Sequence, residues 1–238
     1  NNNYITLNVA DIKAQFELNW EIFKGLNYEF TGAMRYVKSD REHQITEFSN
    51  MAEAYRADYN SVIRSSNDFL YKDPNNPEGE AYSVLPYGGF YNRDESMLKS
   101  YDIRNSLRYA GTIGKHDLNI IMGQQIKYAD RQSFSNTGYG YQYNEGGSVS
   151  VDYRIMKMMI ENNFNYYGMG TVRDRFAAFY FNADYGYDKR YIASATVRYD
   201  GTNALGTSRT ARWLPTWNVS GKWNVMNEHF MEDVNWID

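Results

Sequence analysis

Apolar and polar residues alternate along this chain with a period of two, over runs longer than ten residues. Between Ile12 and Ile22 every even position is apolar, and the odd positions carry lysine, glutamine, asparagine or glutamate. A helix is excluded for this run, because its 3.6-residue repeat would place Gln15 on the same face as Ile12 and Phe16. The same alternation recurs and predicts antiparallel strands. These lie near residues 11–23, 26–38, 99–113, 117–132, 175–187, 190–200 and 212–226.

The predicted strands are too long for an ordinary soluble sandwich, whose strands run to about 5–6 residues. Twelve residues span roughly 40 Å, which still crosses a hydrocarbon layer after a tilt of about 40°. The apolar faces also carry no charge, whereas one lysine or arginine facing lipid at mid-membrane would cost about 2–4 kcal/mol. The pattern therefore predicts an all-β fold: a segment of about seven strands from an antiparallel transmembrane β-barrel.

The connections between the predicted strands alternate between short and long. Turns after Phe23, Ile113 and Tyr187 span only a few residues, whereas the other connections run near residues 39–98, 133–174 and 201–211. This alternation is typical of a barrel with tight periplasmic turns and long extracellular loops. The first long loop contains a helix-like stretch, and the second contains a methionine-rich segment.

Composition narrows the classes of function. The 238 residues include no cysteine, which excludes a disulfide scaffold, a zinc ribbon and a cysteine nucleophile. The net charge of −4 and the absence of a long basic run argue against a nucleic-acid partner. A mean hydropathy of −0.70 agrees with barrel strands that are apolar on one face only. Neither end resembles a signal peptide or a natural terminus, so we expect a slice of a longer chain.

Motifs for enzymatic or metal chemistry are weak. His43, His116 and His229 lack ligand spacing, and residues 73–80 resemble a calcium loop only faintly, with a proline at a ligand position. The acidic pairs at 94–95 and 232–233 are expected to be solvated rather than to form a glycosidase dyad. No nucleophile elbow, phosphate loop or zinc-protease helix occurs in the sequence. We therefore expect no enzymatic activity, no metal and no cofactor.

Aromatic residues in the long loops are the candidate binding residues, because flat rings with a polar tip stack on sugars or grip peptide side chains. Alternatively, they pack the loops against one another. The candidates are Tyr82, Tyr87, Phe90, Tyr91, Tyr139, Tyr141 and Tyr143. A second set of polar residues is expected to face a wet barrel interior or a plug, in a role that is more often structural than selective. This set comprises Glu17, Glu21, Glu29, Arg35, Arg104, Arg108, Arg198 and Lys222.

The C-terminal part of the chain resembles a known family. A strand ending in Arg-x-Asp-Gly at 198–201 precedes a loop, and then an aromatic–proline strand runs into serine, glycine and tryptophan. This order is similar to that of the SusC/RagA-like TonB-dependent outer-membrane transporters of Bacteroidetes. The residues on the family pattern, expected to be structural, are Arg198, Asp200, Gly201, Pro215, Ser220 and Trp223. Residues 175–238 match well, whereas 11–38 and 99–128 match in pattern only.

The resemblance implies a 22-stranded, plugged barrel in the bacterial outer membrane, of which this chain would form about a third of the wall, without plug or N-terminal extension. It also implies a SusD-like surface lipoprotein as a lid, energy from TonB–ExbB–ExbD through the missing N-terminal part, and contact with outer-membrane lipid. The cargo would be an oligosaccharide or a peptide. Two alternatives remain: a soluble β-rich carbohydrate-binding module, and a surface adhesin.

Overall fold

The computed structural model describes residues 2–85, 87–149, 152–206, 208 and 212–231. The chain forms two compact units, each assembled from three segments. The first, here called the loop unit, comprises Asn1–Asp11, Val37–Leu98 and Arg131–Val172. The second, here called the turn unit, comprises Ile12–Tyr36, Lys99–Asp130 and Arg173–Asp238.

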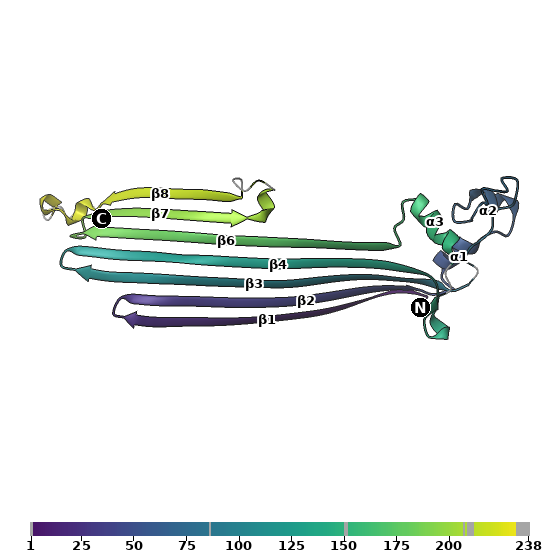
Figure 1. Ribbon diagram of the computed structural model, residues 1–238, viewed down its shortest axis with the longest axis horizontal. Helices are drawn as coiled ribbons and strands as arrows, with labels where there is room; N and C mark the ends of the chain where they lie inside the picture. The colour runs from purple at the N-terminus through teal and green to yellow at the C-terminus, as the bar shows by residue number, and fades with distance from the viewer. Residues whose placement is uncertain (1, 86, 150–151, 207, 209–211, 232–238) are drawn as a thin grey trace. The chain divides into compact units, whose positions relative to one another are not determined.

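One antiparallel sheet contains all the described strands, in the order β1-β2-β3-β4-β6-β7-β8 (Figure 1). The strands are β1 (Asn3–Phe23), β2 (Leu26–Ile45), β3 (Gly89–Ile113), β4 (His116–Gln142), β6 (Tyr167–Tyr187), β7 (Tyr191–Thr202) and β8 (Trp213–Trp223). The two-residue β5 (Ser148–Val149) pairs with β4. The predicted all-β class is confirmed, and β1 and β8 are the edges of this sheet among the described residues. Within the described chain, no helix has the length and apolar character needed to cross a bilayer.

The pairing register sorts side chains in the turn unit onto two faces. Across β6, β7 and β8, Phe181 pairs with Val197, which in turn pairs with Trp217. The neighbouring row pairs Asn182 with Thr196. Because successive side chains in a strand point to opposite faces, one face of these strands is apolar and the other is polar.

Tight turns join the strands within the turn unit. Gly25 and Gly114 have φ values of +88° and +60°, which a glycine adopts without steric cost. In the β6–β7 turn, Asp188 and Lys189 take φ values of +52° and +56°, and the Arg190 amide closes the turn on the Tyr187 carbonyl oxygen at 2.9 Å. The short connections expected from the sequence are therefore present.

Several strands are longer than the alternation indicates. β2 runs to Ile45 instead of residue 38, β3 begins at Gly89 instead of 99, and β4 ends at Gln142 instead of 132. β1 and β6 likewise begin earlier, at Asn3 and Tyr167. The β2 extension carries polar and charged residues on both faces, so its sequence lacks the apolar signal, while strand neighbours still supply the hydrogen bonds. The first long connection is accordingly shorter than expected and spans residues 46–88.

The loop unit contains its own hydrophobic core, in which α1 (Asn50–Arg56) and α3 (Tyr153–Glu161) lie close together (Figure 1). The Ser49 hydroxyl caps α1 by accepting from the Ala52 amide at 3.1 Å. Spacing of three and four residues directs one face of α3 inward. The buried core residues are Ile45, Ala52, Tyr55, Val84, Leu85, Phe90, Tyr139, Ile155, Met158 and Met159.

The remaining helical elements are short. They are α2 (Ser61–Ser66) and the 3-10 turns η1 (Tyr143–Glu145), η2 (Asn203–Leu205), η3 (Val225–Asn227) and η4 (His229–Met231). α2 buries none of its residues. The Asn60 side chain caps it by accepting from the Ile63 amide at 2.9 Å.

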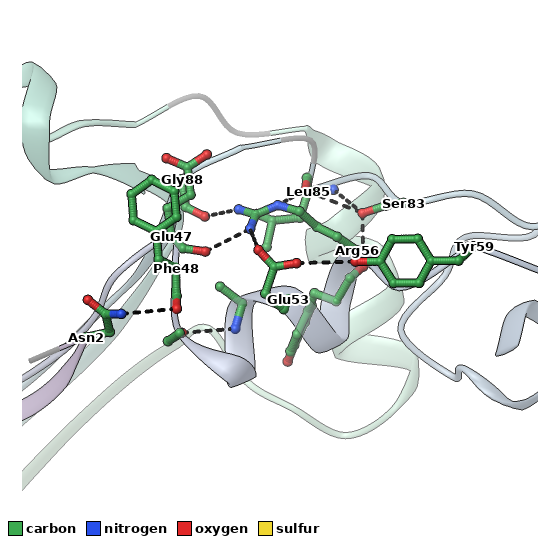
Figure 2. A network of polar contacts seen from close by, with 12 residues as sticks. Asn2, Glu47, Phe48, Glu53, Arg56, Tyr59, Ser83, Leu85 and Gly88 are labelled. Atoms are coloured by element: carbon green, nitrogen blue, oxygen red, sulfur yellow. Dashed lines mark hydrogen bonds and ion pairs between the residues drawn. The ribbon is translucent and has the colours of Figure 1, made fainter.

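Arg56 ties the first long connection together, as Figure 2 shows. Its guanidinium donates to the Leu85 carbonyl and to the Glu47 carbonyl, each at 3.0 Å, and also to the Gly88 carbonyl. The Glu53 carboxylate lies 3.8 Å from the same guanidinium. One side chain thus satisfies three backbone acceptors from two segments, at Glu47 and at residues 85–88, which a single lysine ammonium could not match in geometry.

Candidate functional site

The polar face of the turn unit contains a hollow of about 480 Å³, here called the arginine hollow. Five strands, β2, β3, β4, β6 and β7, contribute side chains to it, so residues distant in sequence meet there. It is lined by Glu29, Arg104, Ser106, Arg108, Ile121, Gln125, Tyr180, Asn182, Thr196 and Arg198. Four of these residues belong to the polar set expected to face a barrel interior, and the structure brings them together.

Three of the four charged groups that line the arginine hollow have a hydrogen bond or an ion pair with a described residue. The Glu29 carboxylate accepts from the Ser106 hydroxyl at 3.3 Å and lies 3.9 Å from Nε of Arg108. Nε of Arg198 donates to both oxygens of Asp200, at 2.7 and 2.9 Å. Asp200 thus holds the Arg198 guanidinium, and Glu29 lies near that of Arg108.

The floor of the hollow is buried and closely packed. Ser106 and Gln125 are 7% and 5% exposed, and the Gln125 amide donates to both oxygens of Asp102 at 3.1 Å. A Cβ at Gly123 would come within 2.5 Å of the Tyr180 ring, so this glycine makes room for the ring. The hollow therefore has a built floor.

The opposite face of the turn unit presents aromatic and aliphatic side chains. Tyr101 stacks on Tyr128 with ring centroids 5.1 Å apart, and Tyr199 stacks on Trp213 at 4.8 Å. Trp217 on β8 is 76% exposed. An exposed apolar face of this kind is typical of a surface that contacts lipid or another protein.

The structure separates the candidate loop aromatics into buried and exposed groups. Phe90 and Tyr139 are only 2% and 5% exposed and meet edge to face at 5.6 Å, so both contribute to packing the loop core. Tyr141 stacks on Tyr91 at 4.9 Å and approaches Tyr143 at 4.7 Å. The three rings form a continuous aromatic row.

Tyr143 is fixed at the end of this row. Its hydroxyl donates to the Phe90 carbonyl at 2.7 Å, and burial raises the pKa of the Tyr143 phenol. The phenol therefore stays neutral at physiological pH and serves as a hydrogen-bond donor.

The other two candidates have exposed rings. The Tyr82 hydroxyl accepts from Arg154 at 2.6 Å, and the guanidinium carbon of Arg154 lies 5.5 Å from the Tyr82 ring centroid. Asp152 holds the same guanidinium at 3.0 Å, and these hydrogen bonds raise the pKa of Arg154 and lower that of Asp152. Tyr87 is 47% exposed and precedes Gly88, which Arg56 binds. Contact of any of these aromatics with cargo stays a prediction.

A second hollow, of about 540 Å³, lies in the loop unit. Serine hydroxyls and glycines alternate in its wall, at Ser133 and Ser135 on β4 and at Gly168 and Gly170 on β6. Its charged members are Glu95 and the exposed ion pair between Arg41 and Asp94, 2.9 Å apart. Sequence reasoning missed this hollow because it counted these positions as loop, although their period of two was a visible signal.

The residues of the family motif lie on β7 and β8 or beside them. A Cβ at Gly201 would come within 2.7 Å of the Trp213 ring, which explains the absence of a side chain there. Pro215 pairs with Tyr199 on an edge strand, where a missing amide hydrogen is tolerated. Ser220 pairs with Ser194. A purely structural role for these residues stays a prediction.

Trp223 belongs to a polar cluster that closes the β6–β7 turn. Its indole Nε1 donates to Glu228 at 3.0 Å, and the Tyr191 hydroxyl donates to the same carboxylate at 2.7 Å. Arg190 lies 3.2 Å from Glu228 and 3.2 Å from Asp188. The hydrogen bonds from Tyr191 and Trp223 hold the pKa of Glu228 below its ordinary value.

Other groups considered for chemistry have structural partners. Asp94 pairs with Arg41, and Glu95 lies 2.6 Å from Arg93, while residues 232–233 fall outside the described chain. The His116 ring contacts the Tyr185 hydroxyl at 2.7 Å. Among the described residues, no three histidines or carboxylates group closely enough to hold a metal ion.

Sequence comparison finds two relatives. No protein-family model matches the chain. The TonB-dependent receptor SusC of Bacteroides thetaiotaomicron is 23% identical over 148 residues, and the TonB-dependent receptor P39 of Formosa agariphila is 24% identical over 156 residues. The matches cover 61% and 63% of this chain, but only 13% and 14% of the relatives' length.

Structural comparison agrees with the sequence comparison. The RagAB peptide transporter matches with a TM-score of 0.65 at 15% identity, and the RagAB peptide importer in its "closed-closed" state matches at 0.62 and 15% identity. Each match covers 97% of this chain and 21% of the solved one. The predicted resemblance to SusC/RagA-like transporters is confirmed, and the fold is that of a piece of their barrel.

Proposed function

We propose that this chain is part of the wall of an outer-membrane barrel that imports large nutrients with energy from TonB–ExbB–ExbD. The observation that carries the proposal is the division of the turn unit into a largely apolar face and a polar face. On the apolar side, Phe179, Val197 and Trp217 are 51%, 47% and 76% exposed. Burying such a face in lipid is favourable by about 25 cal/mol per Å² of apolar surface.

The polar face would then line the path taken by cargo. Its arginines, amides and hydroxyls surround the arginine hollow. Water-filled barrel interiors are polar in this way, and their side chains tune selectivity. Because the sheet has two open edges, it would complete its hydrogen bonds with further strands of the same barrel.

The loop unit would form part of the extracellular mouth and contact a SusD-like lipoprotein lid. Support comes from its exposed apolar side chains, among them Phe48, Tyr59 and Tyr153, which are 73–76% exposed. RagAB, whose structure this chain resembles, is a peptide importer. We accordingly place peptides ahead of oligosaccharides as cargo, with Tyr82 and Tyr87 among the residues offered to it.

Detergent extraction of the natural full-length protein tests this proposal. We expect the protein to fractionate with outer membranes and to copurify with a surface lipoprotein, both detected by intact mass and peptide mass spectrometry. A protein that stays monodisperse in water without detergent would contradict the barrel and favour a carbohydrate-binding module. A membrane protein without a lipoprotein partner and without TonB-dependent uptake would favour an adhesin.

A further inference from the structure

We propose that the arginine hollow binds the side-chain carboxylates of an acidic peptide, an inference that rests on the proposed import function and names the charge class of its cargo. Arg104, Arg108 and Arg198 all line this one hollow, and Glu29 is the one carboxylate in its lining. Asp200 and Asp102 lie beside this lining and bond Arg198 and Gln125, so Arg104 is the guanidinium of the hollow that has no carboxylate partner among the described residues, and it favours an anionic ligand.

The three arginines differ in how many of their hydrogen-bond donors are already used within the protein. Asp200 already occupies Nε of Arg198, and Glu29 lies near Arg108. Arg104 has no ion pair or hydrogen bond with any other described residue, and it is exposed on the polar face. Its five donors are therefore available to a ligand.

Guanidinium geometry selects carboxylate over neutral groups. The planar fork donates two parallel hydrogen bonds to a carboxylate, which are shorter and stronger than those to a neutral amide or hydroxyl. Asn182 and Thr196, paired across β6 and β7 in the same lining, supply groups that suit peptide amides. A neutral oligosaccharide has no group that would use the charge of Arg104.

The size and floor of the hollow also suit a ligand. Its volume of about 480 Å³ falls within the range of small-ligand sites, about 300–1,000 Å³. Ser106 and Gln125 form a buried polar floor whose own hydrogen bonds are satisfied by Glu29 and Asp102. The floor is thus held in place, while Arg104 stays open above it.

The test measures peptide binding to the natural full-length transporter, purified in detergent with any lipoprotein that accompanies it. The probes are a fluorescent hexapeptide of alternating glutamate and alanine, its glutamine counterpart, and a galacturonate oligosaccharide, with both peptides amidated at the C-terminus. We expect fluorescence anisotropy to give at least about tenfold tighter binding for the glutamate peptide, since hydrogen bonds to charged groups are the stronger ones. Raising the salt concentration should weaken this preference.

Arginine variants test whether Arg104 causes the preference for the glutamate peptide. Arg104→Gln should remove most of the preference for glutamate, and Arg104→Lys, which keeps the charge but loses the fork, should retain part of it. Arg173→Gln serves as the control, because Arg173 pairs with Asp130, 3.6 Å away, and shares a strand face with Phe179. Heat-dependent gel mobility verifies that each variant is folded, and it must match the parent before binding is compared.

Several outcomes would overturn the inference. Equal affinity for the two peptides, or equal loss in Arg104→Gln and Arg173→Gln, would refute a carboxylate site in the arginine hollow. Tighter binding of the galacturonate would assign the hollow to acidic glycans instead of peptides. TonB-dependent uptake is measured in parallel: if it persists for both peptides and in every variant, the import function stands and only this site fails.

Discussion

In the loop unit, apolar side chains are buried within the protein itself, whereas in the turn unit they lie on an exposed sheet face. Among the described residues, every buried hydrophobic side chain except Ala178 belongs to the loop unit. The turn unit instead exposes residues such as Phe181, Val197 and Trp217. Apolar side chains of the loop unit are thus removed from water by packing in a core. Those of the turn unit form a surface that requires an apolar environment outside the chain.

The largest expected effect is on the loop core. Phe90→Ala should destabilise the loop unit by about 3–5 kcal/mol, because it empties a fully buried site. Hydrogen–deuterium exchange of amides in residues 46–88 would measure this as loss of protection. Phe48→Ala, at a residue that is 76% exposed, should change protection by less than about 0.5 kcal/mol. Equal effects of the two substitutions would contradict the described core.

A charge on the apolar face tests the environment of the turn unit. Val197→Arg should cost about 2–4 kcal/mol in the membrane-folded protein, because a guanidinium would face lipid. Urea titration of folding into lipid vesicles would measure it. Ser194→Arg is the matched control, since Ser194 lies on the polar face of β7 and pairs with Asp184. A larger cost at Ser194 would reverse the assignment of the two faces.

Arg56 tests how much polar contacts, as opposed to apolar packing, contribute to the order of the loop unit. Arg56→Lys should destabilise residues 46–88 by about 1–3 kcal/mol, since at least two of three partly buried carbonyl acceptors lose their donor. Limited proteolysis of that connection should accelerate accordingly. Arg41→Lys, in an exposed pair with Asp94, should leave the digestion rate nearly unchanged. Resistance of Arg56→Lys to digestion would show that the guanidinium is not needed to order the connection.

The smallest expected effect concerns pH and the cluster around Glu228. Its pKa is lower in the folded protein than the ordinary 4.5, so folding is favoured above that pH, and this contribution is lost as pH falls through the folded pKa. We expect the Asn224 amide, which donates to the Arg190 carbonyl at 2.7 Å, to lose exchange protection in this acidic range. In Glu228→Gln the pH dependence should disappear, and its persistence there would assign it to another group.

The strand segments of the turn unit could be predicted from the sequence because their environment imposes a period of two. Every second residue from Ile12 to Ile22 is apolar, and this phase is readable without neighbours. The extension of β2 was not predictable in this way. Residues 38–43 read Lys-Ser-Asp-Arg-Glu-His, polar on both faces, and they are held in β2 by pairing and by contacts such as Arg41 with Asp94.

The site was predictable only in part. The polar set included Glu29, Arg104, Arg108 and Arg198, but the sequence could not reveal that these four share one hollow, because they come from three strands, β2, β3 and β7. The loop aromatics illustrate the opposite difficulty. Phe90 and Tyr87 look alike in a glycine-rich segment, yet one is 2% and the other 47% exposed. That difference depends on the packing of α1 and α3, which sequence spacing does not determine.

The register of β6, β7 and β8 also limits how the length of this chain can change during evolution. Val197 pairs with both Phe181 and Trp217, so deleting one residue within β7 would exchange the apolar and polar faces for part of the strand. Deleting two residues would keep every remaining side chain on its own face. Among homologous chains, insertions and deletions inside these strands should therefore occur in even numbers, whereas the connection after Thr202 is free to vary by single residues.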